Sequence, residues 1–220
     1  MHIPDGFLNG ATMTATAVAS AGGLGVAVKM AGRHLGERQV PLMGIMGAFI
    51  FAAQMLNFPV AGATSGHLVG AALAAILLGP WAAIIVMSLV LIAQCLIFQD
   101  GGLLALGANI FNMSIIAVLG AHLVHRLLIK VAGEDKPLVA GFGAAWFSVF
   151  MASAVAALEL AVSGTAPLDA VLPAMAGVHA LIGIGEGLVT VAVLGLVRVA
   201  RSDLLLPKRA QVLTERNENE

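Results

Sequence analysis

Seven stretches of the chain are almost continuously apolar and long enough to cross, or nearly cross, a lipid bilayer. A transmembrane helix needs about 20 such residues, because it rises about 1.5 Å per residue through a hydrocarbon core about 30 Å thick. The pattern therefore predicts an all-α integral membrane protein, a seven-transmembrane-helix bundle in one domain over residues 1–220. The seven stretches cover residues 11–32, 40–56, 65–79, 80–98, 103–130, 137–163 and 170–200.

The basic residues predict how this bundle is oriented. With seven helices, all eleven Lys and Arg residues fall on the side that also holds the C-terminus: Lys29, Arg33, Arg38, Arg126, Lys130, Lys136, Arg198, Arg201, Lys208, Arg209 and Arg216. The positive-inside rule makes that side cytoplasmic. We therefore expect residues 204–220 to form a cytoplasmic tail and the N-terminus to lie outside. Six helices would split these charges between both sides, which favours seven.

The third stretch is too short to span the membrane fully. About 14 helical residues precede Gly79-Pro80, or roughly 21 Å of helix against a core of roughly 30 Å. The uncharged segment 57–66 before it suggests a re-entrant loop, and His67 should then lie in the first turn of a sunken helix. Thr64 or Ser65 would be the N-cap, and the helix dipole would favour a neutral imidazole. The alternative is a capping histidine that binds no ligand.

Composition removes several classes of function. The chain is 60% hydrophobic and 10% charged, with a mean hydropathy of +0.99, which excludes an ordinary soluble domain. A net charge of −1 gives no indication of nucleic-acid binding. The single cysteine, Cys95, excludes an internal disulfide and fits a small buried apolar residue. No cleavable signal peptide is predicted at the start of the chain.

The first two residues can form a metal chelate. A free Met1 amine, the His2 backbone nitrogen and the His2 Nδ1 close a five-membered and a six-membered ring around one metal ion. These three nitrogens lie in one plane, and tetragonal nitrogen sites suit late divalent metals such as Ni(II) or Cu(II). A Met-His start is also common by chance. The large His2 should protect Met1 from removal, although the residues do not tell whether a longer leader precedes it.

Four segments together resemble one known family. They are Met1-His2-Ile3-Pro4-Asp5-Gly6-Phe7, Ala63-Thr64-Ser65-Gly66-His67, the segment from Ala105 through Asn109 to Met113, and the segment from His179 to Glu186-Gly187. The chain resembles the substrate-capture S components of cobalt and nickel energy-coupling factor transporters, the CbiM/NikM family. This resemblance implies that His67 is the fourth ligand beside Met1 and His2. It also implies that bound Co(II) or Ni(II) is the substrate, with no further cofactor.

Other polar residues lie near the expected site. Asn109 and Asn112 are three residues apart on one helix face and could hold the N-terminal peptide or support His2, or simply join helices. His179 and Glu186 lie on one stripe of the last helix. His179 could touch the site or its loop, whereas Glu186 lies too deep for a direct ligand and should pair with another helix.

The family resemblance also implies partners. It implies a transmembrane coupling (T) component, two ATP-binding cassette (ABC) ATPases and, in some members, a small accessory membrane subunit, all in the cytoplasmic (inner) membrane of a prokaryote. The small residues Ala15 and Ala19 of the first helix would help docking on the coupling component, or would serve packing within the chain. The chain has no Walker A motif, so we expect a non-catalytic subunit that binds no nucleic acid.

Three alternatives remain open. An ion-coupled secondary metal transporter would need a charged relay and often has internal repeats, which the sequence does not show. A metal-dependent membrane enzyme would keep an open coordination position, and a purely structural subunit would bind no metal. The sequence does not separate cobalt from nickel, and we lean to cobalt for cobalamin biosynthesis because the chain is most like the cobalt branch.

Overall fold

The computed structural model describes residues 1–33, 35–36, 39–60, 64–201 and 204. The regular structure of the described residues is helical apart from one short hairpin, and the expected tail, 204–220, lies outside the described residues except for Leu204. The helices are α1 (Gly10–Ala31), α2 (Gln39–Gln54), α3 (Ala71–Leu78), α4 (Pro80–Phe98), α5 (Leu106–Ile110), the π-helical η1 (Phe111–Ile116), α6 (Ala117–Ala132), α7 (Pro137–Val162) and α8 (Leu168–Ala200). The strands are β1 (Phe58–Val60) and β2 (Thr64–Gly66).

Five helical segments are long and apolar enough to cross a membrane. They are α1, α4, the continuous run from α5 through η1 to α6, α7 and α8. The apolar helix α2 has 16 residues and α3 only 8. Each of the seven predicted apolar stretches therefore contains a helix, but two of these helices are shorter than a full span.

The prediction of a helix from residue 65 was wrong. β2 pairs with β1 in an antiparallel hairpin, with Phe58 opposite Gly66. Gly70, at φ +81°, then precedes α3, which begins only at Ala71. Thr64 and Ser65 therefore do not cap a helix, and His67 lies in an irregular segment before α3 rather than in its first turn. Glycines at positions 66 and 70 interrupt the apolar run, and a left-handed φ at Gly70 suits glycine best.

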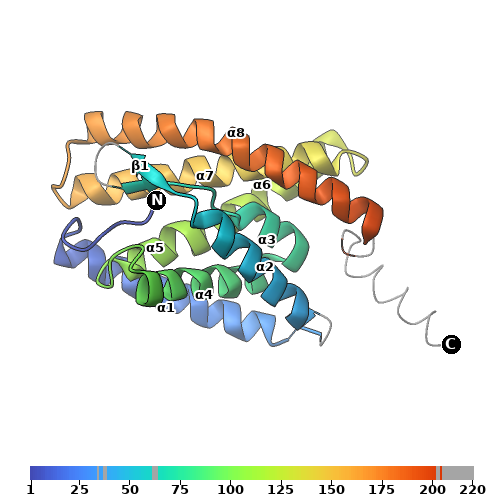
Figure 1. Ribbon diagram of the computed structural model, residues 1–220, viewed down its shortest axis with the longest axis horizontal. Helices are drawn as coiled ribbons and strands as arrows, with labels where there is room; N and C mark the ends of the chain where they lie inside the picture. Colours follow the sequence, from blue (N-terminus) through green and yellow to red (C-terminus); the bar gives the residue numbers. More distant parts are fainter. Residues whose placement is uncertain (34, 37–38, 61–63, 202–203, 205–220) are drawn as a thin grey trace.

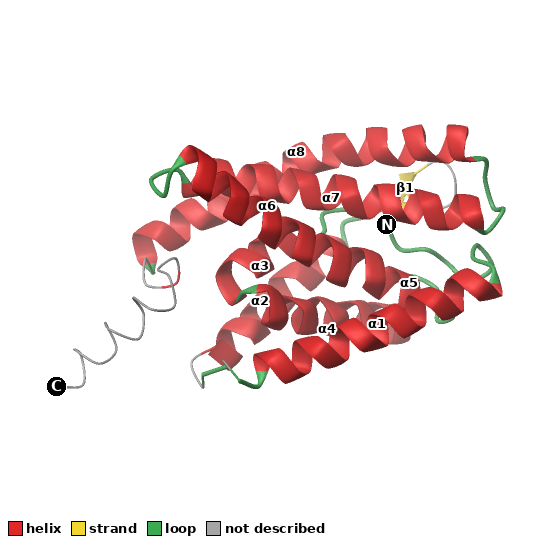
Figure 2. Ribbon diagram, turned by 180° about the vertical axis from the view of Figure 1, so that it is seen from behind, coloured by secondary structure: helices red, strands yellow, loops and turns green. Residues whose placement is uncertain are grey.

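One end of the bundle collects the loops that matter for the site. Figures 1 and 2 show the N-terminal peptide, the β1–β2 hairpin, the α4–α5 loop and the α7–α8 loop together at this end, with the N-terminus between the helices. The described basic residues belong to the opposite end, where α1, α6 and α8 finish and α7 begins: Lys29, Arg33, Arg126, Lys130, Lys136, Arg198 and Arg201.

Small residues let the helices approach closely. A Cβ on Gly107 of α5 would lie 2.6 Å from the Ala17 Cα of α1, and the Ser20 hydroxyl donates to the Gly107 carbonyl at 2.7 Å. Packing within the chain therefore uses the backbone at Ala17, although Ala17 is exposed on α1 like Ala15 and Ala19.

Candidate metal-binding site

The N-terminal peptide is buried inside the bundle rather than lying on its surface. Met1 and Ile3 are completely buried and His2 is only 4% exposed. Asn109 of α5 holds Ile3 from both sides, because its Oδ1 accepts from the Ile3 N–H at 2.8 Å and its Nδ2 donates to the Ile3 carbonyl at 3.1 Å. The Gly102 N–H also donates to that carbonyl, at 2.9 Å. The backbone around His2 is thus fixed like a short strand.

Asp5 fastens the same peptide to the α4–α5 loop. Its carboxylate accepts from the N–H groups of Leu103, Leu104 and Ala105 at 3.1, 2.8 and 3.2 Å. At Gly102 any Cβ would overlap the Asp5 side chain. The close approach of the two segments therefore depends on glycine at this position.

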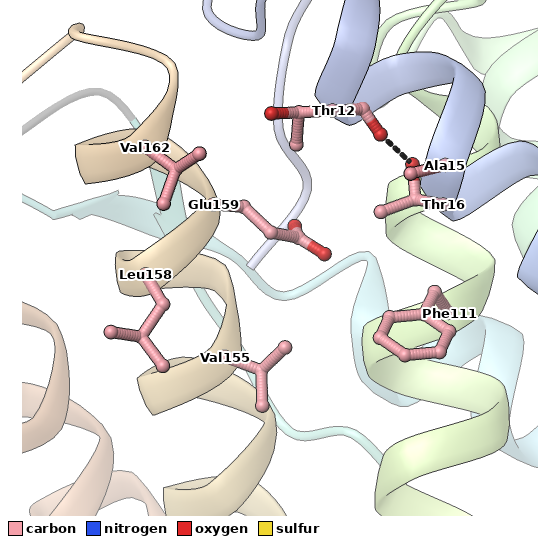
Figure 3. A pocket seen from close by; sticks show the side chains of 8 residues that line it. All are labelled: Thr12, Ala15, Thr16, Phe111, Val155, Leu158, Glu159 and Val162. Atoms are coloured by element: carbon pink, nitrogen blue, oxygen red, sulfur yellow. Dashed lines mark hydrogen bonds between the residues drawn. The ribbon is translucent and has the colours of Figure 1, made fainter.

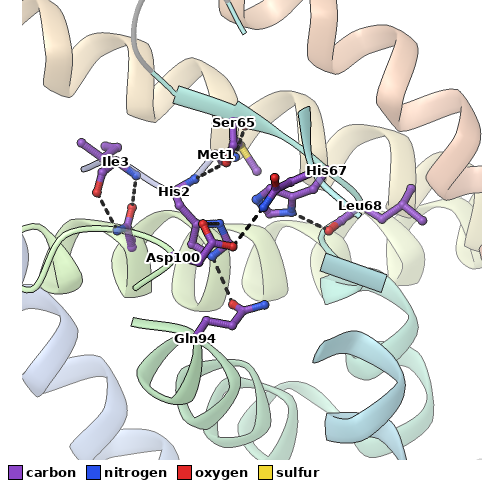
Figure 4. Close-up of polar contacts among 10 residues, drawn as sticks. Met1, His2, Ile3, Ser65, His67, Leu68, Gln94 and Asp100 are labelled. Atoms are coloured by element: carbon purple, nitrogen blue, oxygen red, sulfur yellow. Dashed lines mark hydrogen bonds and ion pairs between the residues drawn. The ribbon is translucent and has the colours of Figure 1, made fainter. Parts of the chain in front are cut away.

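Ser65 contacts the two backbone nitrogens that the chelate would use (Figure 4). The Met1 amine donates to the Ser65 carbonyl and lies 3.2 Å from its Oγ, and the His2 N–H donates to the same Oγ at 3.3 Å. Met1 and His2 therefore lie beside Ser65 of β2, and His67 follows directly after this strand.

The His2 imidazole lies between two acceptors. Its Nε2 is 3.1 Å from the Gln94 Oε1 of α4, a contact that favours the tautomer with the proton on Nε2 and the lone pair on Nδ1. The Asp100 Oδ1 lies 3.3 Å from Nδ1, and the other Asp100 oxygen accepts from the Asn57 side chain at 3.1 Å. Nδ1 is the nitrogen that the six-membered chelate ring requires.

His67 is presented to His2 with its lone pair unused. Its Nδ1 donates to the Leu68 carbonyl at 2.7 Å, which leaves the lone pair on Nε2. This Nε2 is buried and has no hydrogen-bond partner among the described residues. The His2 and His67 rings are stacked, with centroids 4.6 Å apart and planes inclined by 23°. A hydrogen bond on the remote ring nitrogen is the usual arrangement for a metal-binding histidine.

Burial keeps these nitrogens neutral. It lowers the pKa of the Met1 amine from 8.0 to about 4, against the opposing charge of Asp100. Burial, helped by the positive charge of the nearby amine, lowers the pKa of His2 from 6.5 to about 3 and that of His67 well below 6.5. Burial also raises the pKa of Asp100. The bases at this site therefore carry lone pairs rather than protons near neutral pH.

Glu186 positions the segment that carries His67. Its carboxylate, completely enclosed between helices, accepts from the N–H groups of Val69 and Gly70, the latter at 2.6 Å. Gln54 of α2 adds a hydrogen bond to the Val69 carbonyl at 2.7 Å. Glu186 thus ties α8 to the segment just before α3.

The remaining predicted residues lie around the site at different distances from the peptide. The His179 Nδ1 donates to the Met175 carbonyl at 2.8 Å, and its ring also interacts with the Ser65 backbone. The Asn112 side chain donates to Glu159 at 2.7 Å rather than to the N-terminal peptide. The structure therefore brings Met1, His2, His67 and Asn109 together, whereas Asn112 interacts with Glu159 instead.

Sequence reasoning missed four residues of the site: Asp5, Ser65 as a contact of the peptide, Gln94 and Asp100. A polar side chain within the apolar stretch 80–98 was a usable signal for Gln94. Within the described part of the chain, no three His, Cys, Asp or Glu side chains lie close enough to hold a metal ion. A metal here would therefore need the backbone nitrogens of the N-terminal peptide as well as the two imidazoles.

Comparison with known proteins shows the family of the chain. Residues 2–204 match the CbiM family, described as the cobalt uptake substrate-specific transmembrane region. A putative fused nickel transport protein, NikMN, from Archaeoglobus fulgidus is 41% identical over 96% of this chain and 70% of its own length. A cobalt transport protein, CbiM, from a Nostoc species is 33% identical over 69% of this chain and 60% of its own length. A crystal structure described as a transition metal transporter superposes with a TM-score of 0.86 at 32% identity, over 98% of this chain and 99% of that chain. The chain is therefore a multi-pass membrane protein of cobalt and nickel transport that belongs to the CbiM family.

Proposed function

We propose that this protein captures Co(II) or Ni(II) through four nitrogens: the Met1 amine, the His2 backbone nitrogen, the His2 Nδ1 and the His67 Nε2. The observation that carries the proposal is the pair of tautomers set by Gln94 and Leu68, which leaves a lone pair on the His2 Nδ1 and on the buried His67 Nε2. The Met1-His2 backbone supplies the other two nitrogens within the same buried space.

The charges of the site suit a divalent ion. A metal with two positive charges and one deprotonated amide leaves a net charge of +1, and the Asp100 carboxylate beside the His2 Nδ1 would cancel it. A neutral sum matters because isolated charges are costly in a buried site. Binding would also exchange the Ser65 hydrogen bonds of the amine and the amide for bonds to the metal.

Energy for transport would come from other subunits. The chain contains no Walker A motif, so we propose that it is the substrate-specific S component of an energy-coupling factor transporter, driven by two ABC ATPases through a T component. The exposed Ala19 on α1, together with Ala15, which also lines a groove beside α7, provides a small-residue surface for such a partner. The described basic residues lie at the end of the bundle opposite the site, which supports a site on the outer side of the cytoplasmic membrane.

The proposed ion is cobalt, because residues 2–204 match the cobalt uptake family, and nickel is the alternative. A planar set of four nitrogens favours nickel by geometry, and the relatives named above include both cobalt and nickel transport proteins. An ion-coupled secondary transporter is the alternative of another class. Liposomes that hold only this chain would take up metal autonomously if it were one, and we expect no such uptake.

Elemental analysis of the purified full chain tests the site. The parent should retain about one Co(II) or Ni(II) ion per chain, because a preformed set of buried ligands binds stoichiometrically. His67→Ala removes the fourth nitrogen, and one alanine inserted after Met1 separates the amine from His2. Both changes should abolish retention, whereas His125→Ala at the opposite end of the bundle should not. Equal metal in all four proteins would refute the proposed ligands.

A further inference from the structure

A second polar feature lies away from the metal-binding site, in a groove between α1 and α7. This groove encloses about 280 Å³ and opens between two membrane-spanning helices (Figure 3). Its apolar walls are formed by Ala15 of α1, Phe111 of η1, and Val155, Leu158 and Val162 of α7. Glu159 is the ionisable residue that lines it.

The Glu159 carboxylate is only half satisfied. The residue is 8% exposed, and its Oε2 accepts from the Asn112 Nδ2 at 2.7 Å. Its Oε1 is buried and has no hydrogen-bond partner among the described residues, and the same holds for the Asn112 Oδ1. Figure 3 shows the Glu159 side chain pointing from α7 into the space before α1. Two buried acceptors without donors indicate a missing donor group, preferably a cationic one.

None of the described lysines and arginines can supply that cation. They all belong to segments at the opposite end of the bundle. A partner membrane protein is also a poor source, because the positive-inside rule depletes basic residues on the outer side of its helices too. The lipid headgroup region is a source of cations at this depth.

The position of Glu159 matches a headgroup. It lies three residues before the end of α7 at Val162, or about 4.5 Å along the helix axis, which places it near the outer interface in the orientation proposed above. Leu158 and Val162, 46% and 73% exposed, continue the groove onto the lipid-facing surface. An acyl chain could follow these apolar side chains towards the bilayer centre.

We propose that the α1–α7 groove binds a phospholipid with a primary ammonium headgroup, whose N–H groups donate to the Glu159 Oε1 and the Asn112 Oδ1. A quaternary ammonium has no N–H and cannot make these hydrogen bonds. The site should therefore distinguish phosphatidylethanolamine from phosphatidylcholine, although the two differ only by methyl groups on nitrogen.

Native mass spectrometry of the full chain tests this selectivity. The detergent-solubilised protein would be mixed with equal amounts of phosphatidylethanolamine, phosphatidylcholine and phosphatidylglycerol that carry identical acyl chains. We expect phosphatidylethanolamine adducts to exceed phosphatidylcholine adducts by about tenfold, the effect of a charge-assisted hydrogen bond. Glu159→Gln should remove this excess. Asp169→Asn, which neutralises an exposed carboxylate in the first turn of α8, should preserve it.

A second variant guards against a folding defect. Ala15→Leu narrows the groove without touching the carboxylate and should reduce all lipid adducts at this site, with a melting temperature near that of the parent. Equal binding of phosphatidylethanolamine and phosphatidylcholine by the parent would overturn the proposal. An undiminished excess of phosphatidylethanolamine adducts in folded Glu159→Gln would also overturn it. If Glu159→Gln does not fold, unchanged lipid adducts in Ala15→Leu would overturn it instead.

Discussion

Gln94 decides which nitrogen of His2 is free to bind metal. The Gln94 Oε1 accepts a hydrogen bond from the His2 Nε2–H, and this tautomer leaves the lone pair on Nδ1, within the chelate. His67 is oriented in the same way by the Leu68 carbonyl, but there the acceptor is backbone and cannot be removed by substitution. Gln94 is therefore the side chain through which the tautomer can be tested.

Gln94→Leu should weaken metal binding by about 10–100-fold, because loss of the partner on the remote ring nitrogen releases both the tautomer and the ring orientation. Competition against a chromophoric chelator measures the change. Ser88→Ala is a matched control, since Ser88 is also buried on α4 but bonds to Ser114, away from the site. Affinity in Gln94→Leu within twofold of the parent would mean that the hydrogen bond does not orient His2.

Sequence reasoning at this scale worked where the chemistry is local. Met1 and His2 form a chelate through neighbouring atoms, and the motif around Asn109 stood out by its polarity within an apolar run. Ser65 and Asp100 could not be assigned in the same way. Their contacts join residues more than 60 positions apart, and only the packing of β2 and the α4–α5 loop around the N-terminal peptide brings them to the site.

The N-terminal peptide and the α4–α5 loop form one structural element of the site. Gly102 both donates to the Ile3 carbonyl and leaves the space that Asp5 occupies. Asp5 in turn accepts three loop N–H groups, so displacement of either segment would break several hydrogen bonds at once. Insertion of the peptide should therefore be cooperative.

Gly102→Ala should displace this peptide, because its Cβ would overlap Asp5 and overpacking of this kind costs about 1–3 kcal/mol. We expect faster acylation of the Met1 α-amine, followed by mass spectrometry of the N-terminal fragment, together with a lower metal content. Gly44→Ala provides the control, since a Cβ at this exposed position of α2 meets open space. Identical labelling rates in the two variants would show that the close approach at Gly102 does not hold the peptide in place.

Helices in long apolar runs could be predicted from the sequence, whereas the structure of a short apolar run could not. The limits of α4 at residues 80 and 98 could be read from Gly79-Pro80 and from the polar residues after Phe98. The segment before α3 could not, because an apolar segment that is buried as an irregular loop has the same composition as a short buried helix. The structure shows how its backbone is satisfied: Glu186 of the distant helix α8 accepts from the N–H groups of Val69 and Gly70, and Gln54 donates to the Val69 carbonyl.

The two ends of the whole molecule differ in charge and in the loops that they carry. The N-terminal peptide and its supporting loops gather at one end of the bundle, and the described basic residues lie in elements that finish or begin at the other. The positive-inside rule then predicts that the metal-binding end faces outward.

Cysteine labelling in intact cells can check this orientation. In a Cys95→Ala background, a cysteine introduced by Asp169→Cys in the first turn of α8 should react with a membrane-impermeant maleimide. One introduced by Glu134→Cys in the α6–α7 loop should react only after the cells are permeabilised. The reverse pattern would place the site on the cytoplasmic side and contradict uptake from outside.

Proton release on metal binding is the most direct test of the central claim, the four-nitrogen chelate. At pH 7 the Met1 amine, with a pKa of about 4, and His2, with a pKa of about 3, are already neutral, as is His67. Only the His2 amide would then lose a proton, so calorimetric titration with Ni(II) or Co(II) in buffers of different ionisation enthalpy should give about one proton per metal ion. A value near zero would contradict binding through the amide, and two or more would contradict the neutral, buried state of the other ligands.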